Sequence, residues 1–176
     1  SGTSGSSGVS FSVVGTTNTI VKFTSPSTIG DSNTTDITHS ISVNSVTVGR
    51  GAGNNISNAV VGNNALANNT TGEKNSAFGQ SALTNNTFGQ YNTAVGFYGL
   101  FSNTTGNNNT AIGALSLQQN TSGIANIAIG RSALNGNTIG NYNSAVGLSS
   151  MQQNTTGSNN NAFGYKALYS NTTNNN

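Results

Sequence analysis

The sequence predicts an all-β chain dominated by a parallel β-solenoid, and three observations carry that prediction. An apolar residue followed by glycine recurs every 17 residues from Gly62 to Gly164. Seven such units fill residues 58–176 without an insertion or a deletion. Charged residues make up 5% of the chain, against roughly 25% in ordinary domains. Uncharged, Asn-rich units with a fixed period are typical of stacked repeats and not of the common kind of disordered chain.

Each unit is numbered from its first asparagine, so that Asn58 is position 1 of the first unit. The consensus is N-x-A-φ-G-x-x-A-L-x-x-N-T-x-G-x-x, where φ is a larger apolar residue. The A-φ-G stretch suits a brief strand, while x-x-A-L-x-x suits a second strand or one helical turn, and a single turn is not stable alone. We therefore expect a solenoid of seven 17-residue coils, spaced about 4.8 Å apart.

Asparagine occupies two positions of the unit without exception. A turn alone would accept Asp, Ser or Gly in some copies, so the invariance favours ladders in which each side-chain amide binds the next coil. The simpler alternative is that asparagine merely suits turns. The expected ladders are Asn58, Asn75, Asn92, Asn109, Asn126, Asn143 and Asn160 at position 1, and Asn69, Asn86, Asn103, Asn120, Asn137, Asn154 and Asn171 at position 12.

Two glycines per unit mark expected corners of the coil, where the backbone adopts a positive φ or lies close to a neighbour. Position 15 is glycine except for Asn174, and asparagine is the next best residue for a left-handed backbone. Position 5 is glycine in every unit, namely Gly62, Gly79, Gly96, Gly113, Gly130, Gly147 and Gly164.

The expected core consists of two large apolar residues per unit, together with small residues at positions 3 and 8. This is a thin supply against the backbone entropy of 17 ordered residues, which costs about 1–2 kcal/mol each. A core shared between copies eases the shortage, so we expect an intertwined or side-by-side homotrimer in preference to a monomeric solenoid. The core residues are Val61, Phe78, Val95, Ile112, Ile129, Val146 and Phe163 at position 4, and Leu66, Leu83, Leu100, Leu117, Leu134, Met151 and Leu168 at position 9.

The pattern differs before the repeats, so residues 1–57 are expected to form a β-rich cap or connector. β-Branched residues predict strands at 9–14 and 19–23. Residues 37–48 alternate between apolar and polar, with a phase shift after Asn44. The pair Val48-Gly49 resembles a degenerate first repeat.

Few side chains in this chain could carry catalysis. The only acids are Asp31, Asp36 and Glu73, the only histidine is His39, and there is no cysteine. Without paired carboxylates or a ligand cluster, we expect no enzyme activity and no catalytic, metal or cofactor site. A scattered net charge of +2 predicts no nucleic-acid binding. No apolar run is long enough to predict insertion into a membrane.

The units NTAVGFYGLFSNTTGNN and NTAIGALSLQQNTSGIA, which begin at Asn92 and Asn109, resemble the repeats of bacteriophage tail fibres and bacterial surface fibres. The preceding ISVNSVTVGRGAGN is similar to the segment that commonly leads into those repeats. The A-[IV]-G core is also similar, more weakly, to the head repeats of trimeric autotransporter adhesins. This resemblance implies an obligate homotrimer of parallel β-coils with an extracellular or virion-surface location.

The expected function is a structural fibre shaft that projects a host-receptor site or contributes to attachment, with a host-surface glycan or receptor as a further partner. One alternative is a self-assembling extracellular filament subunit. Another is an ice-binding β-solenoid that uses the threonine at position 13, although Phe88 and Ile139 interrupt the neighbouring position 14. Aromatic residues at variable positions either contact sugars or partners or fill gaps between chains; they are Tyr91, Phe97, Tyr98, Phe101, Tyr142, Tyr165 and Tyr169.

Overall fold

The computed structural model describes residues 40–43 and 46–175. The chain divides into two compact units, Ser1–Thr35 and Asp36–Asn176. The strands expected at 9–14 and 19–23 fall in the first unit, which lies outside the described residues. The second unit contains all of the structure considered below.

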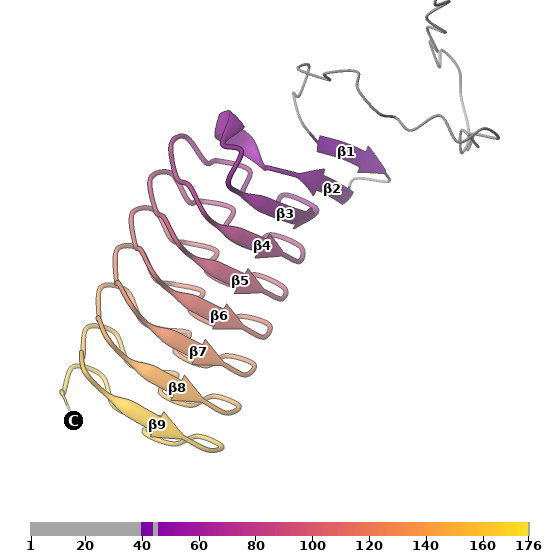
Figure 1. Cartoon of the computed structure of the whole chain (residues 1–176). Coiled ribbons are helices and arrows are strands. Elements are labelled where there is room, and N and C mark those ends of the chain that lie inside the picture. Colours follow the sequence, from indigo (N-terminus) through magenta and orange to yellow (C-terminus); the bar gives the residue numbers. More distant parts are fainter. Residues whose placement is uncertain (1–39, 44–45, 176) are drawn as a thin grey trace, which may run out of the picture. The chain divides into compact units, whose positions relative to one another are not determined.

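Short parallel strands, one per repeat, build a β-solenoid with about 17 residues in each of about six turns. Neighbouring strands pair in register, so that Ala77 lies opposite Ala94 and Ala94 opposite Ala111. Figure 1 shows these strands side by side in chain order. They are β3 (Ala59–Gly62), β4 (Ser76–Phe78), β5 (Thr93–Val95), β6 (Thr110–Ile112), β7 (Ile127–Ile129), β8 (Ser144–Val146) and β9 (Asn161–Phe163). The seventh coil expected from the sequence goes beyond the six turns that these pairings show.

An antiparallel hairpin covers the N-terminal edge of the stack. Strands β1 (Ser40–Val43) and β2 (Val46–Gly49) pair with each other, and β2 also runs antiparallel to β3, with Val48 opposite Val61. The phase shift in the 37–48 pattern therefore coincides with a reversal of the chain. The interpretation of Val48-Gly49 as a degenerate first repeat was wrong, because a repeat would place these residues on a parallel strand.

A short 3₁₀ turn, η1 (Ala52–Asn54), completes this cap. The Ala52 amide donates to the carbonyl of Leu66 at 3.1 Å. The Ala52 carbonyl accepts from Nδ2 of Asn69 at 3.2 Å. The cap thus gives hydrogen-bond partners to backbone and side-chain groups of the first coil at the edge where a preceding coil would otherwise lie.

The rest of each coil is irregular backbone whose hydrogen bonds go mostly to the neighbouring coils, with a few closed inside the coil, such as the Asn103 amide to the Leu100 carbonyl. The Tyr98 amide donates back to the carbonyl of Gln80, and the Leu100 amide donates forward to Ser116, both at 3.0 Å. The x-x-A-L-x-x segment is therefore neither a second strand nor a helical turn. Its position-7 and position-9 amides, such as those of Tyr98 and Leu100, are satisfied only when coils stack on both sides.

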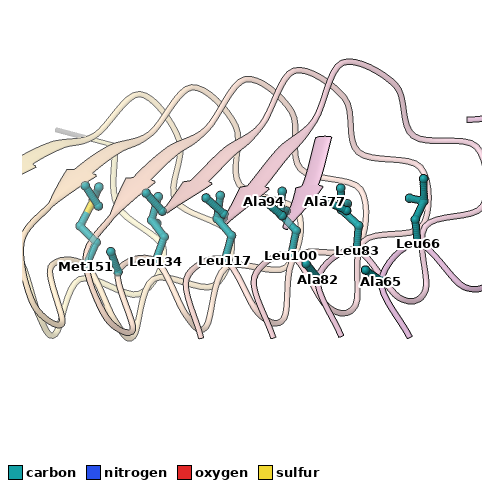
Figure 2. Close-up of a cluster of buried hydrophobic side chains, with 14 of the residues drawn as sticks. Ala65, Leu66, Ala77, Ala82, Leu83, Ala94, Leu100, Leu117, Leu134 and Met151 are labelled. Atoms are coloured by element: carbon teal, nitrogen blue, oxygen red, sulfur yellow. The ribbon is translucent and has the colours of Figure 1, made fainter. Parts of the chain in front are cut away.

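The interior of the solenoid holds one large apolar side chain per turn, except that the first turn also buries Val60. Figure 2 shows these side chains in a single row that includes Leu83, Leu100 and Leu117, each 0% exposed. Small residues at positions 3 and 8, such as Ala77 and Ala82, fill the space beside them. The fully buried members of the row are Leu66, Leu83, Leu100, Leu117, Leu134 and Met151.

The expectation that position 4 belongs to the core was wrong for the single chain. Ala94 at position 3 of β5 points inward, so Val95 at position 4 points outward and is 39% exposed, because successive side chains on a strand face opposite sides. Phe163 is 71% exposed. The outward residues are Val61, Phe78, Val95, Ile112, Ile129, Val146 and Phe163. Leu168, also expected in the core, is 39% exposed because no described coil covers it.

Candidate functional site

Asparagine at position 1 forms a buried ladder along the stack. Oδ1 of Asn75 accepts from both the backbone amide of Asn92, at 3.0 Å, and its Nδ2, at 3.2 Å. Nδ2 of Asn92 also donates to the carbonyl of Gly106 at 2.8 Å. The same arrangement repeats at the next steps, for example from Asn109 to Asn92. Each side-chain amide therefore binds groups of two coils. Its Oδ1 accepts from the residue that precedes the strand of the next coil, and its Nδ2 donates to a carbonyl of its own coil.

Asparagine at position 12 forms a second buried ladder, in which each Nδ2 likewise donates to Oδ1 of the preceding coil. Nδ2 of Asn103 donates to Oδ1 of Asn86 at 2.8 Å and to the carbonyl of Gly106 at 3.0 Å. Oδ1 of Asn103 in turn accepts from Asn120 at 2.9 Å. Aspartate has no amide donor and serine has a single donor on a shorter side chain, which explains why neither replaces asparagine in any unit.

The glycine at position 15 joins the two ladders. Its carbonyl accepts from both asparagines, as Gly106 does from Asn92 and Asn103. A Cβ on Gly106 would lie 2.4 Å from Oδ1 of Asn103 and 2.5 Å from the carbonyl oxygen of Gly123. The reason for glycine at this position is close approach, and the left-handed backbone considered for it is not observed.

Asn174, the one exception at position 15, coincides with a looser ladder. Nδ2 of Asn171 lies 3.3 Å from the Asn174 carbonyl and 3.4 Å from Oδ1 of Asn154. These are the longest bonds of the position-12 ladder.

Threonine at position 13 forms a third ladder that the sequence reasoning missed. Oγ1 of Thr104 donates to the carbonyl of Thr121 at 3.0 Å, and Oγ1 of Thr121 donates to Thr138 at 3.1 Å. From the sequence, these threonines were considered only for an ice-binding surface. The ladder could have been predicted from the invariance of threonine directly after the position-12 asparagine.

The glycine at position 5 is a corner with a positive φ. Values run from 122° at Gly164 to 152° at Gly62. A Cβ on Gly96 would also lie 2.7 Å from the carbonyl carbon of Gly113. Both conformation and space therefore require glycine here.

Left-handed backbone also occurs at positions 7, 9 and 17, where the sequence analysis expected none. The buried leucines adopt it, with φ of 52° at Leu83 and 49° at Leu100. This conformation costs about 1–2 kcal/mol for a residue with a Cβ. The available signal was that Val, Ile and Thr, for which left-handed backbone is most costly, are absent from these three columns in a chain rich in all three.

The outward residues at position 4 form the most extensive apolar feature of the described surface, and we name these seven side chains the apolar column. The column residues of β5, β6 and β7 are 38–40% exposed. Position 2 lies on the same face and holds Thr93, Thr110 and Ile127. Neither position carries a charged residue in any repeat unit.

Charged groups are sparse and peripheral in the part of the chain that the structure describes. Nζ of Lys74 donates to the Tyr91 hydroxyl at 2.8 Å and lies 3.9 Å from Oε1 of Glu73. The hydrogen bond to Tyr91, followed by the electrostatic interactions with Tyr91 and Glu73, raises the pKa of Lys74. No group of His, Cys, Asp and Glu that could hold a metal occurs among the described residues. Asp31, Asp36 and His39 lie outside them.

The described residues include no helix with the length and apolar character needed to cross a membrane. No protein-family model matches the chain, and neither a curated protein nor a solved structure matches it. Function is therefore inferred from the geometry of the ladders, the apolar column and the exposed aromatic side chains.

Proposed function

We propose that the chain is a structural shaft, part of a bacteriophage tail fibre or a bacterial surface adhesin, that projects or contributes to a host-receptor site outside the cell or on a virion. The apolar column is the observation that carries this proposal. Two buried asparagine ladders and a more exposed threonine ladder hold successive coils in one register, so equivalent side chains lie above one another along the stack. A mechanical element needs this regularity, and the resemblance of the repeats to fibre repeats agrees with it.

The column is the face along which copies of the chain associate. Monomeric soluble proteins seldom expose contiguous apolar patches larger than a few hundred Å². The column runs in the stacking direction, so a parallel copy can cover it coil by coil. The proposed assembly is a homotrimer. The number of copies rests on the resemblance to trimeric fibres, and the contact surface is the exposed apolar column.

The column alone is too narrow for a stable interface. Stable complexes bury about 800 Å² per partner, and seven side chains that are already partly covered offer less than this. The position-2 residues beside the column must therefore take part. Their small, uncharged side chains suit that role, because the centres of interfaces are depleted of charge.

Two rival functions are weakened by specific contacts. A head-to-tail filament would need an open parallel edge at the N-terminal end, and the antiparallel strand β2 occupies that edge. An ice-binding surface would need threonine hydroxyls directed to water, and those at position 13 donate to carbonyls of the next coil. The shaft is therefore favoured over both.

The solution mass of the purified chain at low micromolar concentration tests the proposal, measured by light scattering after size exclusion. A mass near three times 17.7 kDa is expected. Ile112→Lys, in the middle of the column, should reduce the mass to that of a monomer. Gln119→Lys adds the same charge to the same coil outside the strand and should leave the trimer intact. A wild-type monomer, or an Ile112→Lys trimer, would contradict the proposed association.

A further inference from the structure

Three aromatic side chains of one coil form a continuous ledge beside the end of β5. The ring centroids of Phe97 and Tyr98 are 4.4 Å apart, and those of Tyr98 and Phe101 are 4.6 Å apart. Phe97 is 46% exposed. We name Phe97, Tyr98 and Phe101 the aromatic ledge.

The coil does not need these rings in order to fold. Its interior is filled by Ala94 and Leu100, both 0% exposed. The preceding coil has the same backbone without aromatic residues, since Ser81 has a φ of 58° and Tyr98 has a φ of 56°. The residues at the ledge positions of that coil are Gln80, Ser81 and Thr84.

The distribution of the rings separates the ledge from a contact between copies. A contact that runs along a shaft should repeat in every coil, as the apolar column does. The ledge positions carry aromatic residues in two coils only, that of β5 and that of β9 with Tyr165 and Tyr169. In the second coil, Nζ of Lys166 lies 5.4 Å from both ring centroids. The ledge of the β5 coil has no such cation over its rings, so it has the features of a local neutral site.

The surroundings of the ledge select the chemistry of its ligand. No charged residue occurs at the ledge positions in the coils of β4, β5 or β6, which gives neither an anion nor a cation a partner. Amide side chains lie at the ledge positions of the coils on either side. Gln80 is exposed, and Gln118 accepts from Asn135 through Oε1, which leaves its amide N–H groups to donate. Electron-rich ring faces flanked by amides suit the C–H face and hydroxyls of a sugar ring.

We propose that the aromatic ledge is a binding site for a neutral oligosaccharide, with a pyranose ring packed on Phe97 and hydroxyl groups directed to Gln80 and Gln118. The site lies within one chain and does not depend on the proposed association. It provides the shaft with a lateral attachment point separate from any site at its tip.

The test replaces the ledge with the chain's own alternative from the preceding coil, as Phe97→Gln, Tyr98→Ser and Phe101→Thr combined. Cellohexaose, maltohexaose and chitohexaose are titrated separately to about 10 mM, and aromatic ring signals are followed by NMR. At least one sugar should shift the Phe97, Tyr98 and Phe101 signals saturably, with a Kd of about 1 mM. The triple variant should bind that sugar at least about tenfold more weakly.

Tyr142→Asn is the matched control, because it removes an isolated exposed tyrosine and introduces the residue found at that position in the next coil, Asn159. It should bind the sugar as the wild type does. Circular dichroism and light scattering should show an unchanged fold and mass in both variants. The proposal is overturned if no sugar shifts the ring signals, if the triple variant binds equally well, or if it loses mass, which would assign the rings to contacts between copies.

Discussion

Replacing Asn103 by alanine tests the claim that the ladders hold the coils together. Asn103 is 0% exposed and lies in the middle of the position-12 ladder. Its amide donates to Asn86 and to Gly106, and its Oδ1 accepts from Asn120. The substitution removes all three hydrogen bonds and leaves the backbone able to keep its turn.

The cost follows from what each partner retains. Oδ1 of Asn86 loses its hydrogen-bond donor, and a buried unsatisfied group costs about 1–3 kcal/mol. The Gly106 carbonyl keeps its bond from Asn92, and the amide of Asn120 keeps its bond to Gly123. Adding two weakened groups and a small cavity gives a total of about 2–5 kcal/mol.

Urea unfolding followed by circular dichroism, at one fixed chain concentration, measures this loss. Asn171→Ala is the control in the same ladder, because its bonds are 3.3 and 3.4 Å long; it should cost less than about 0.5 kcal/mol. If Asn103→Ala costs under about 1 kcal/mol, or no more than Asn171→Ala, asparagine serves only as a turn former and the ladder argument fails.

Asn103→Asp separates turn preference from hydrogen bonding at the same position, since aspartate suits turns equally well. The new oxygen would face Oδ1 of Asn86 across the 2.8 Å that the amide now spans. Burial and that facing oxygen should raise the pKa of the folded carboxyl above the ordinary value of about 3.9. The folded state then binds more protons than the unfolded state, so stability should fall as the pH rises from about 3.9 through the folded pKa. A pH-independent loss would refute this reasoning.

Three further substitutions probe the glycines, the leucine row and the threonine ladder by the same unfolding assay. Gly99→Ala should stabilise the fold by about 0.4–1 kcal/mol, because φ of Gly99 is not left-handed and a Cβ would lie 3.6 Å from its nearest neighbour. Gly106→Ala should instead cost about 1–3 kcal/mol, because a Cβ there would lie 2.4 Å from an oxygen. Equal effects of the two would contradict the close-approach argument. Leu117→Ala should cost about 2–5 kcal/mol and the 39% exposed Leu168→Ala clearly less; the reverse order would place the core elsewhere. Thr121→Val should cost only about 0.5–1.5 kcal/mol, because the carbonyl that accepts its hydroxyl keeps two backbone donors, and a larger loss would mean that the hydroxyl has another role.

The solenoid could be predicted from the sequence because its cause is periodic. A fixed 17-residue interval puts equivalent groups one strand spacing apart, which makes asparagine at positions 1 and 12 a chain of donors and acceptors. The position-5 glycine follows from the same logic, since a Cβ on Gly96 would approach Gly113 in the next coil.

Which side chains of each strand point into the interior could not be predicted in the same way. Size suggested that Val95 belongs inside, but Ala94 takes the inward place. The near-invariant small residue at position 3 was the better indicator of burial. The left-handed leucines were missed because propensity argues against them, and only stacking on both sides can impose that backbone on residues such as Leu100.

The outward position of the column strengthens the case for association. With one large apolar side chain inside most coils in place of the two expected, a single chain buries less apolar surface than its composition allows. The hydrogen-bonded ladders largely determine the register between neighbouring coils, because a shift of one residue would break three ladders at once. The same register keeps the column straight, since each position-4 residue is held above its equivalent, as Val95 pairs with Ile112. The buried asparagine ladders thus keep the apolar column in line on the outer face. A second copy of the chain can cover this face along its length.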